Sequence, residues 1–433
     1  MKETEKQIQE YIESVCNEIK YSAVHRQIKI ELEDHFTGLI EDLLAQGLSK
    51  DDAIHKALEQ MGDAQLVGKE LNSIHKPKPD WWLLILTMFF VNVGIISLYT
   101  MKKGSLLANP GFFVKTLIYV LLGFVIAIVA YYADYRKIKP FSKHIYLGTL
   151  FVLIITMSFG SLSNGKPYLT IGGLSIDIVG ISPLLFMIAL SGLYDGWNWD
   201  EMKNARLGLV YGAIPAVLLL VSSSATAFII YLLSFLILLY SSKAKPAYIL
   251  TITGACLMVF SLWILQGPHR INRFSTLLYL HRDPLGAGYL NKQLNKVLNS
   301  AGFLGQGLTF KPGVLPELHT DFIFPYIIYT FGWLSGIVLI AGVVAFIIRI
   351  LHIGKTVESY GKLLTISFAS IFATQFLWNI FMTLGLLPLV GISLPFISYG
   401  GSQLVANMLA IGILSSICGK KNAGVDSQVP DIV

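Results

Sequence analysis

The stretch LPELHTDFIFPYIIYTFGWL, residues 315–334, places an acid directly before a long apolar run. Asp321 is followed by uncharged residues as far as Arg349, and a run of this length can cross a bilayer. A charge at the mouth of a membrane helix costs free energy unless it is solvated, paired or used. The stretch therefore predicts an integral membrane protein and makes Asp321 a candidate functional residue.

The composition of the whole chain supports a membrane protein. Of the 433 residues, 54% are hydrophobic and only 14% are charged, whereas soluble domains carry about 25% charged residues. The charge is also divided unevenly. Residues 1–78 hold 10 Lys and Arg against 15 Asp and Glu, while the remaining 355 residues have a net charge of +11. Two parts in different solvents are implied.

The N-terminal part is predicted to be a small helical domain, residues 1–78 including its linker. Apolar residues recur at helical spacing from Ile8 to Ile19 and from Ile28 to Leu43, and Ser49 begins a third helix. The two prolines of KPKPD (76–80) mark the linker. The pattern resembles the helical prefix of some Gram-positive permeases, which implies interaction or regulation. The start MKETEKQIQEYIES lacks the features of a signal peptide, so we expect it to stay in the cytoplasm.

Residues 79–421 are predicted to form an all-α membrane domain with about ten spans, followed by a cytoplasmic tail, residues 422–433. The division near SSSATA (222–227) is the weakest of the predicted boundaries. The expected spans are Trp81–Met101, Phe112–Tyr132, His144–Leu162, Asp177–Tyr194, Leu207–Val221, Ala225–Tyr240, Ala247–Leu265, Phe322–Arg349, Leu363–Thr383 and Ser402–Ile417.

The placement of Lys and Arg predicts that both termini are cytoplasmic. Basic residues gather in the loops on one side, around 136–143, 203–206, 243–245 and 349–362, whereas Lys102, Lys103 and Lys166 lie on the other side. One connection, residues 266–321, is then a long extracytoplasmic loop. Loops of this length inside a membrane domain are usually functional.

The long loop is basic. It holds Arg270, Arg273, Arg282, Lys292, Lys296 and Lys311 against three acids, Asp283, Glu317 and Asp321. A basic loop beside a bilayer suits a phosphate-bearing lipid headgroup, and non-specific attraction to anionic membrane lipids is the alternative. The three cysteines, Cys16, Cys256 and Cys418, are scattered, so they predict neither a disulfide framework nor a metal cluster.

Several motifs of this membrane part resemble the SEDS family (shape, elongation, division and sporulation), whose members include FtsW, RodA and SpoVE. The resemblance covers roughly residues 80–420. It is carried by RDPLGAGY (282–289), GFLGQGL (302–308), LPELHTDFIF (315–324), QFLWNI (375–380) and GLLPLVGISLPFISYGGSQLVANMLAIGIL (385–414). The family consists of ten-span membrane glycosyltransferases that polymerise lipid II into peptidoglycan, usually with a class B penicillin-binding transpeptidase.

The resemblance also implies roles for individual residues. The family's essential extracytoplasmic acid falls on Asp321, the arginine ahead of its DP motif on Arg273, and its DPxGxGY on a string that begins at Asp283. A family glutamine falls on Gln293, whereas the one just after GY is replaced by Leu290. Gln375 and Asn379 match a polar pair of the ninth span. The signature before the tenth span falls on Ser398, Tyr399, Gly400, Gly401 and Ser402.

The chemistry of glycosyl transfer is consistent with these roles. It needs a base for the acceptor hydroxyl and cations for the leaving diphosphate, which we expect to be Asp321 and Arg270, Arg273 and Lys292. His319 would tune the acid. The alternatives are that Asp321 caps a helix, that His319 is a cap or hydrogen-bond partner, and that the small residues of SYGG only let helices pack closely. A divalent cation beside the diphosphate would be chemically sensible, although no protein metal ligands are predicted.

The sequence departs from the family at the fourth span. The family has a glutamate and, three residues later, a lysine; here the corresponding string is Asp177, Ile178, Val179 and Gly180, with Pro183 in place of the lysine. The family's Pro-Asp-Leu-Gly reads Ser222, Ser223, Ser224 and Ala225, and a family tryptophan aligns with Tyr168.

Three hypotheses therefore follow from the sequence. The chain is a divergent peptidoglycan glycosyltransferase at the outer face of the bacterial cytoplasmic membrane, a lipid II translocator, or a non-catalytic scaffold that recruits a transpeptidase. Lipid II, a class B transpeptidase and membrane lipids are the expected partners, and no nucleic acid is expected.

Overall fold

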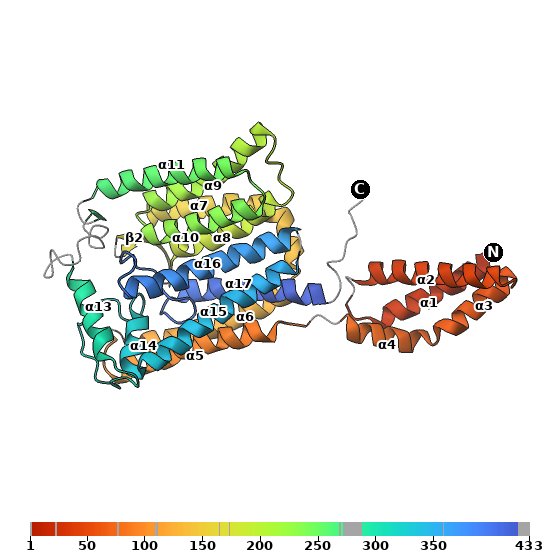
Figure 1. Ribbon diagram of the computed structural model, residues 1–433, viewed down its shortest axis with the longest axis horizontal. Coiled ribbons are helices and arrows are strands. Elements are labelled where there is room, and N and C mark those ends of the chain that lie inside the picture. Colours follow the sequence, from red (N-terminus) through yellow and green to blue (C-terminus); the bar gives the residue numbers. More distant parts are fainter. Residues whose placement is uncertain are drawn as a thin grey trace. The chain divides into compact units, whose positions relative to one another are not determined.

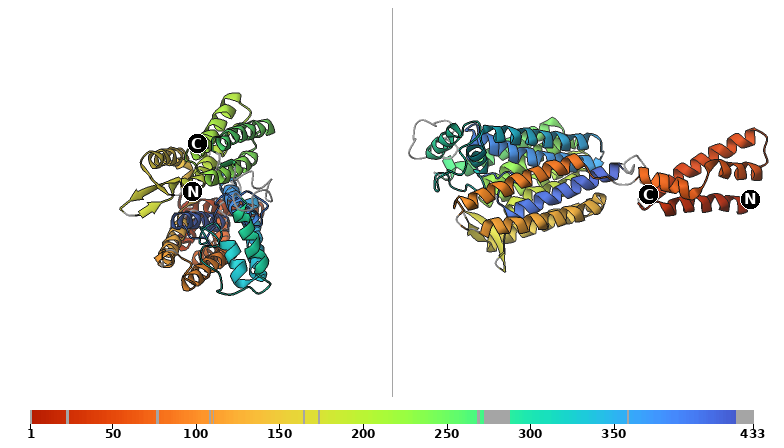
Figure 2. Two further views of the ribbon diagram at one scale, coloured as in Figure 1. Left: turned by 90° about the vertical axis from the view of Figure 1, so that its left-hand side faces the viewer. Right: turned by 90° about the horizontal axis from the view of Figure 1, so that it is seen from below.

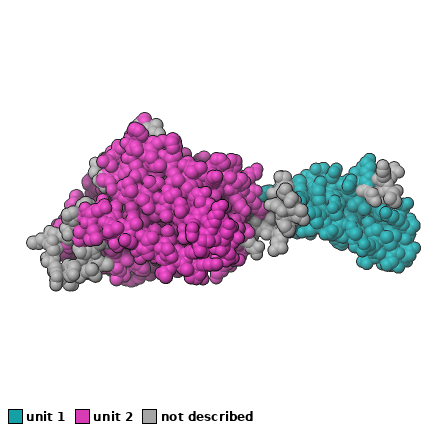
Figure 3. All heavy atoms as spheres, turned by 90° about the horizontal axis from the view of Figure 1, so that it is seen from above, with its two compact units in different colours: residues 1–80, 415–433 teal, residues 81–414 magenta. Residues whose placement is uncertain are grey.

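The computed structural model describes residues 2–21, 24–75, 78–107, 109, 111–163, 165–172, 174–267, 270–271, 288–357 and 359–422. Their contacts divide the chain into two units, one of Met1–Asp80 with Ser415–Val433 and one of Trp81–Leu414, coloured separately in Figure 3. Arg273, Arg282 and Asp283, which the sequence places in the substrate-binding loop, lie outside the described residues.

Within residues 2–75, as far as they are described, the N-terminal unit has four helices, one more than the sequence analysis identified. They are α1 (Lys2–Glu18), α2 (His25–Ala45), α3 (Lys50–Met61) and α4 (Ala64–Ile74). Val15, Ile28 and Phe36 belong to the buried apolar core between them. Ser49 caps α3, as its position in the sequence suggested, and Asp63 caps the additional helix α4 by accepting from two backbone N–H groups.

The larger unit is a bundle of apolar helices (Figures 1 and 2). In membrane segments every backbone polar group must be satisfied within the segment, and helices meet this requirement. The helices are α5 (Trp81–Lys103), α6 (Gly111–Tyr132), η2 (Tyr135–Phe141), α7 (Ser142–Phe159), α8 (Ile178–Tyr194), α9 (Met202–Val221), α10 (Ala225–Ser241), α11 (Pro246–Leu265), α13 (Tyr289–Ser300), α14 (Ile323–Phe331), α15 (Trp333–Lys355), α16 (Ser359–Thr383) and, as far as Leu414, α17 (Gly401–Asn422).

The lengths of these helices identify a multi-pass membrane protein. Among the described residues, eight helices are long and apolar enough to cross a bilayer, and α8 and α10 are shorter apolar helices of 17 residues. Each of the ten predicted segments contains a helix. The weakest boundary is a real one, because α9 ends at Val221 and α10 begins at Ala225.

The helices differ in how much of their surface the protein covers. In the apolar stretch of 18 residues within each helix, 72% is buried inside the protein in α16, against 11% in α11. Helix α16 packs on α8, α10 and α15 and carries polar side chains inward, where the hydroxyls of Ser191 and Ser367 meet at 2.9 Å. Helix α16 is therefore at the centre of the bundle, and α11 turns most of its surface outward.

Prolines inside the helices are matched by specific donors. Pro215 in α9 has no N–H, so the carbonyl of Tyr211 loses its usual intrahelical partner; the Tyr146 hydroxyl donates to it at 2.7 Å. Pro183 in α8 leaves the carbonyl of Val179 in the same position, and the Ser182 hydroxyl donates to it at 2.9 Å. The proline at the family's lysine position is thus accommodated locally.

The predicted span Phe322–Arg349 is not one helix. It breaks at Gly332, whose φ of +86° ends α14 and begins α15. The segment GFLGQG (302–307) clamps this break, because Gln306 and Gly307 donate to the carbonyls of Tyr329 and Thr330. A Cβ on Gly305 would fall on the backbone of Thr330 and Gly332. Close backbone approach explains the glycines here.

The prediction missed a small antiparallel sheet between α7 and α8. The predicted span extended to Leu162, but helix α7 ends at Phe159. Leu162 lies instead in β1 (Ser161–Ser163). Strand β2 (Lys166–Ile171) pairs with β1, Ser161 opposite Tyr168, and with β3 (Leu174–Ile176), Leu169 opposite Ile176. The sheet, α13 and α14 lie at the same end of the bundle, on the left of Figure 1.

Candidate functional site

A large cavity opens at this end of the bundle. Its volume is about 1310 Å³, and it is lined by the β-sheet, the starts of α8, α10 and α17, residues 316–322, residues 387–393 and part of α16. Both charged and uncharged polar groups face it, including Lys166, Asp177, Arg270, Glu317 and Asp321. A chamber of this size with convergent polar groups is suited to a bulky polar ligand.

Asp321 is held in the wall of this cavity through its backbone. Pro325, four residues on, has no N–H, so the carbonyl of Asp321 lacks a donor from α14. The side-chain amide of Asn379 supplies one at 2.9 Å and donates also to the carbonyl of Ile392 at 2.6 Å. The N-cap position of α14 is Phe322, and Asp321 lies one residue before it.

The segment before α17 packs against Asp321 from the other side. The Ser398 hydroxyl donates to the carbonyl of Thr320 at 2.6 Å and accepts from the N–H of Leu394 at 2.9 Å. Gly391 lies against the Asp321 carboxylate, and a Cβ at this position would collide with Oδ2. The Thr226 hydroxyl, at the start of α10, holds the carbonyl of Gly391 at 3.1 Å. The carboxylate therefore sits in a defined place.

His319 is part of an aromatic stack. Its ring lies 5.2 Å from that of Phe112 and 5.6 Å from that of Tyr399, and its carbonyl accepts from the Tyr399 N–H at 2.8 Å. Burial lowers the pKa of His319, opposed by the nearby Glu317. Burial raises the pKa of Tyr168 to about 12, helped by Asp177, Asp321 and Glu317. Near neutral pH both side chains are uncharged.

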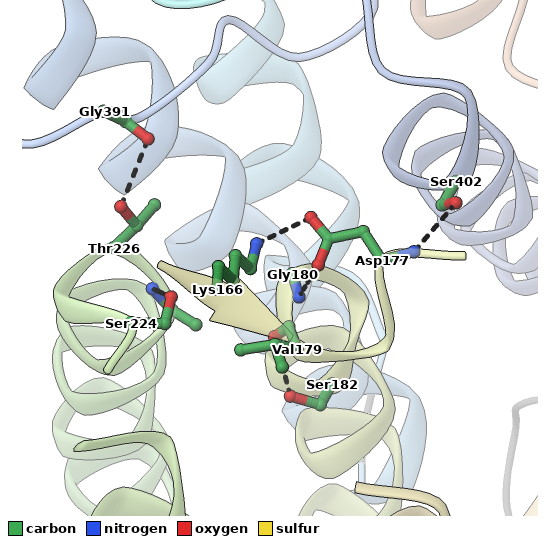
Figure 4. A network of polar contacts seen from close by, with 10 residues as sticks. Lys166, Asp177, Val179, Gly180, Ser182, Ser224, Thr226, Gly391 and Ser402 are labelled. Atoms are coloured by element: carbon green, nitrogen blue, oxygen red, sulfur yellow. Dashed lines mark hydrogen bonds and ion pairs between the residues drawn. The ribbon is translucent and has the colours of Figure 1, made fainter. Parts of the chain in front are cut away.

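Two cations line the cavity among the described residues, and each has a partner. The Arg270 guanidinium stacks on Trp263 at 3.8 Å and donates to its carbonyl at 2.9 Å. The Lys166 ammonium lies 2.6 Å from Asp177 Oδ2 (Figure 4). The sequence analysis used Lys166 only as a marker of topology. Its pairing depends on the hairpin of β2 and β3, which the sequence analysis did not predict.

Asp177 links the hairpin to two helices. Its Oδ1 accepts from the Gly180 N–H at 2.8 Å and so caps α8, and its own N–H donates to the Ser402 hydroxyl at 3.2 Å (Figure 4). The neighbouring Gly401 lies against the ring of Tyr119, where a Cβ would collide. The SYGGS signature therefore both packs helices closely and faces the cavity.

The structure brings most, but not all, of the predicted site residues together. Those that line the cavity are Arg270, His319, Asp321, Gln375, Tyr399, Gly400, Gly401 and Ser402. Asn379 and Ser398 support the wall. Lys292 and Gln293 are in α13 but not in the lining, to which Leu290 and Asn291 contribute instead. Among the described residues no group of three or more His, Cys, Asp or Glu could hold a metal.

Fold and site together define a multi-pass helical membrane protein with an acid and cations in a polar cavity at one end of its bundle. The chain belongs to the FtsW/RodA/SpoVE family, described as "Cell cycle protein", whose model matches residues 79–423. The sequence analysis named this family, and the match confirms it.

Individual relatives agree with this assignment. A probable peptidoglycan glycosyltransferase FtsW of Borreliella burgdorferi is 30% identical over 363 residues, which are 80% of this chain and 97% of the relative. Stage V sporulation protein E of Bacillus subtilis is 25% identical over 363 residues, covering 79% of this chain and 97% of that protein.

Solved structures share the fold. A chain of "Structural coordination of polymerization and crosslinking by a peptidoglycan synthase complex" has a TM-score of 0.66 at 20% identity, covering 78% of this chain and 97% of its own. The rod shape determining protein RodA of Thermus thermophilus has a TM-score of 0.61 at 18% identity, covering 81% and 98%.

Proposed function

We propose that this protein is a peptidoglycan glycosyltransferase that polymerises lipid II at the outer face of the bacterial cytoplasmic membrane. The observation that carries the proposal is the placement of Asp321, clamped by Asn379 and packed on Gly391 in the wall of a polar cavity. The names of the relatives support the same activity. None of the described residues of the prefix, 2–21, 24–75 and 78, lines this cavity, so we assign the prefix a role outside the chemistry.

In the proposed reaction Asp321 accepts the proton of the acceptor sugar's hydroxyl. The hydroxyl oxygen attacks the anomeric carbon of the donor sugar, and the bond from that carbon to the diphosphate oxygen breaks. Inversion at the anomeric carbon follows from a single displacement. The lipid diphosphate leaves with the bonding electron pair, and cations at the cavity stabilise its charge. Arg270 is one such cation, and the sequence assigns Arg273 the same task.

The direct test uses the purified full-length chain with lipid II, alone and with a class B transpeptidase, and measures the length of the glycan chains formed. We expect polymer from the parent and almost none from Asp321→Asn. If the parent protein makes no polymer in either condition, while another family member does so in the same assay, the scaffold hypothesis replaces this one. Movement of lipid II between leaflets without polymer would favour the translocator.

We also propose that both termini are cytoplasmic and that the cavity faces outward, so that it meets lipid II and a transpeptidase there. The uneven distribution of Lys and Arg supports this orientation. Ser300, exposed at the end of α13, can be changed to Cys and labelled with a membrane-impermeant thiol reagent. The native cysteines are buried, so the background is low. Labelling only from the cytoplasmic side would reverse the proposed topology.

A further inference from the structure

The Lys166–Asp177 pair lines the cavity, but the mechanism proposed above assigns it no role. Lys166 lies on β2 and Asp177 immediately before α8, and both line the cavity. Their side chains are 21% and 22% exposed, so the pair is largely removed from water but borders an open chamber.

An ion pair in this position contributes little to stability. Partial burial costs each charge solvation, and the attraction between the two charges roughly offsets that cost, so apolar replacements of such pairs are often neutral. Stability alone therefore does not account for a lysine here.

The two partners are held very differently. Asp177 is fixed by contacts that do not involve Lys166: its Oδ1 caps α8 and its N–H binds Ser402. Within the described part of the chain, the Lys166 ammonium contacts Asp177 Oδ2 and, at 5.7 Å from the ring centre, the face of the Tyr168 ring. A lysine carries three donors on a flexible stem. Its ammonium can therefore turn to an anion in the cavity while Asp177 stays in place.

The charges that line the cavity indicate which cation is available to an anionic ligand. Among the described lining residues the acids Asp177, Glu317 and Asp321 outnumber the two Lys and Arg side chains, so an anionic ligand needs every cation within reach. Arg270 is already stacked on Trp263 and bonded to its carbonyl. The partner of Lys166 is the Asp177 carboxylate, which carries a single charge. A more highly charged ligand can displace it from the ammonium.

We propose that Lys166 binds the diphosphate of the lipid-linked sugar, and that Asp177 holds the ammonium when the cavity is empty. This inference rests on the proposed function and adds to it a substrate-contacting residue and its counter-ion. The alternative role for the pair is a clasp that fastens the hairpin to α8.

The two roles predict opposite results for Asp177→Asn. Asparagine caps a helix about as well as aspartate, so α8 keeps its cap. If Asp177 competes with the ligand for Lys166, removing its charge frees the ammonium and tightens binding. If the pair is a clasp, Asp177→Asn and Lys166→Met both loosen the hairpin and both weaken binding.

The experiment measures the affinity of the purified full-length protein in nanodiscs for a fluorescent polyprenyl diphosphate, a probe that needs no turnover. We expect Lys166→Met to weaken binding roughly ten- to hundredfold, the usual range for a lost charge-assisted hydrogen bond. Asp177→Asn should tighten it by up to about fivefold. The double variant should bind much more like Lys166→Met than like Asp177→Asn, because the main effect of Asp177 on the ligand is its competition for the Lys166 ammonium. Lys103→Met, which removes an exposed lysine from outside both the cavity and the basic loop, is the matched control.

Three results would overturn the inference: parent-like binding by Lys166→Met, weaker or unchanged binding by Asp177→Asn, or no binding of the probe by the parent. Should Lys166→Met fail to fold, the Asp177→Asn result alone decides. The proposed function is judged separately by polymerisation of lipid II. Polymer from the parent with parent-like binding by Lys166→Met refutes only the role of Lys166, whereas the expected binding pattern without polymer refutes only the transferase.

Discussion

The cavity holds two acids that are positioned in opposite ways. Asp321, in the segment before α14, is fixed through its backbone, which Asn379 and Glu317 contact, and its carboxylate rests against Gly391. Asp177, in the segment before α8, is bound through both carboxylate oxygens, one to Gly180 and one to Lys166. Both precede an apolar helix in the sequence, where either could be a cap. Asp177 occupies the N-cap position of its helix, whereas Asp321 lies one residue before the N-cap of α14. An acid's place before a helix therefore does not decide its role.

The same chemical change at the two acids gives the largest expected contrast. Asp321→Asn keeps the volume but removes the base, so we expect polymerisation to fall by about 10²–10⁴-fold with little change in the temperature of unfolding. Asp177→Asn should change the rate of polymerisation by less than about fivefold. The accompanying change in affinity should be towards tighter binding. Glycan formation from lipid II by the two purified variants measures both. Equal losses at the two acids would remove the distinction between base and counter-ion.

Gly391→Ala sharpens the comparison from the side of the wall. The added Cβ would collide with Asp321 Oδ2, the end of a side chain that can turn away. We expect the protein to fold normally while activity falls on the order of 10²-fold, because a displacement of about 1 Å can cost that much. Gly254→Ala in α11, where a Cβ would meet nothing within 4 Å, is the control. Parent-like polymerisation by Gly391→Ala would show that the carboxylate position does not matter.

Asn379→Leu tests the backbone clamp of Asp321. It removes the donor to the carbonyls of Asp321 and Ile392, and each buried carbonyl left without a donor costs about 1–3 kcal/mol. We therefore expect a lower unfolding temperature in detergent. It is measured by heating the protein with a thiol-reactive dye, which reports exposure of the buried cysteines. Thr226→Val removes a single, solvent-exposed hydrogen bond to the carbonyl of Gly391. It should therefore lower the unfolding temperature less. An Asn379→Leu protein as stable as the parent would contradict the clamp.

The smallest expected effect concerns His319 and pH. Burial lowers the pKa of this side chain in the folded state below its ordinary value of about 6.5, so the unfolded chain binds the proton first on acidification. Stability should therefore be lost as the pH falls through about 6.5 towards the folded pKa, and be unaffected by this group at higher pH. His319→Phe keeps an aromatic ring beside Phe112 and Tyr399 and removes the titration. Thermal unfolding of both proteins between about pH 7.5 and 5 measures the difference; identical profiles would contradict it.

Features governed by local rules could be predicted from the sequence. Apolar length alone placed a helix correctly in each of the ten predicted spans, because a lipid solvent leaves the backbone few other ways to satisfy its hydrogen bonds. The motifs from 282 onward predicted the family, and Asp321 was identified by its position before an uncharged run. The one-helix prediction for Phe322–Arg349 failed at Gly332, since hydropathy does not register a change in backbone conformation.

The sequence by itself determined that Asp321 has a carbonyl without a helical donor, because Pro325 lacks an N–H whatever surrounds it. Only the tertiary structure decided that the donor is Asn379, 58 residues away, and that Gly391 bounds the carboxylate. The same holds for Asp177: the chain places it before α8, but its partners Lys166 and Ser402, the second 225 residues away, depend on a hairpin and on helix packing. A missing N–H is a property of one residue, whereas the group that compensates for it is set by which elements pack together.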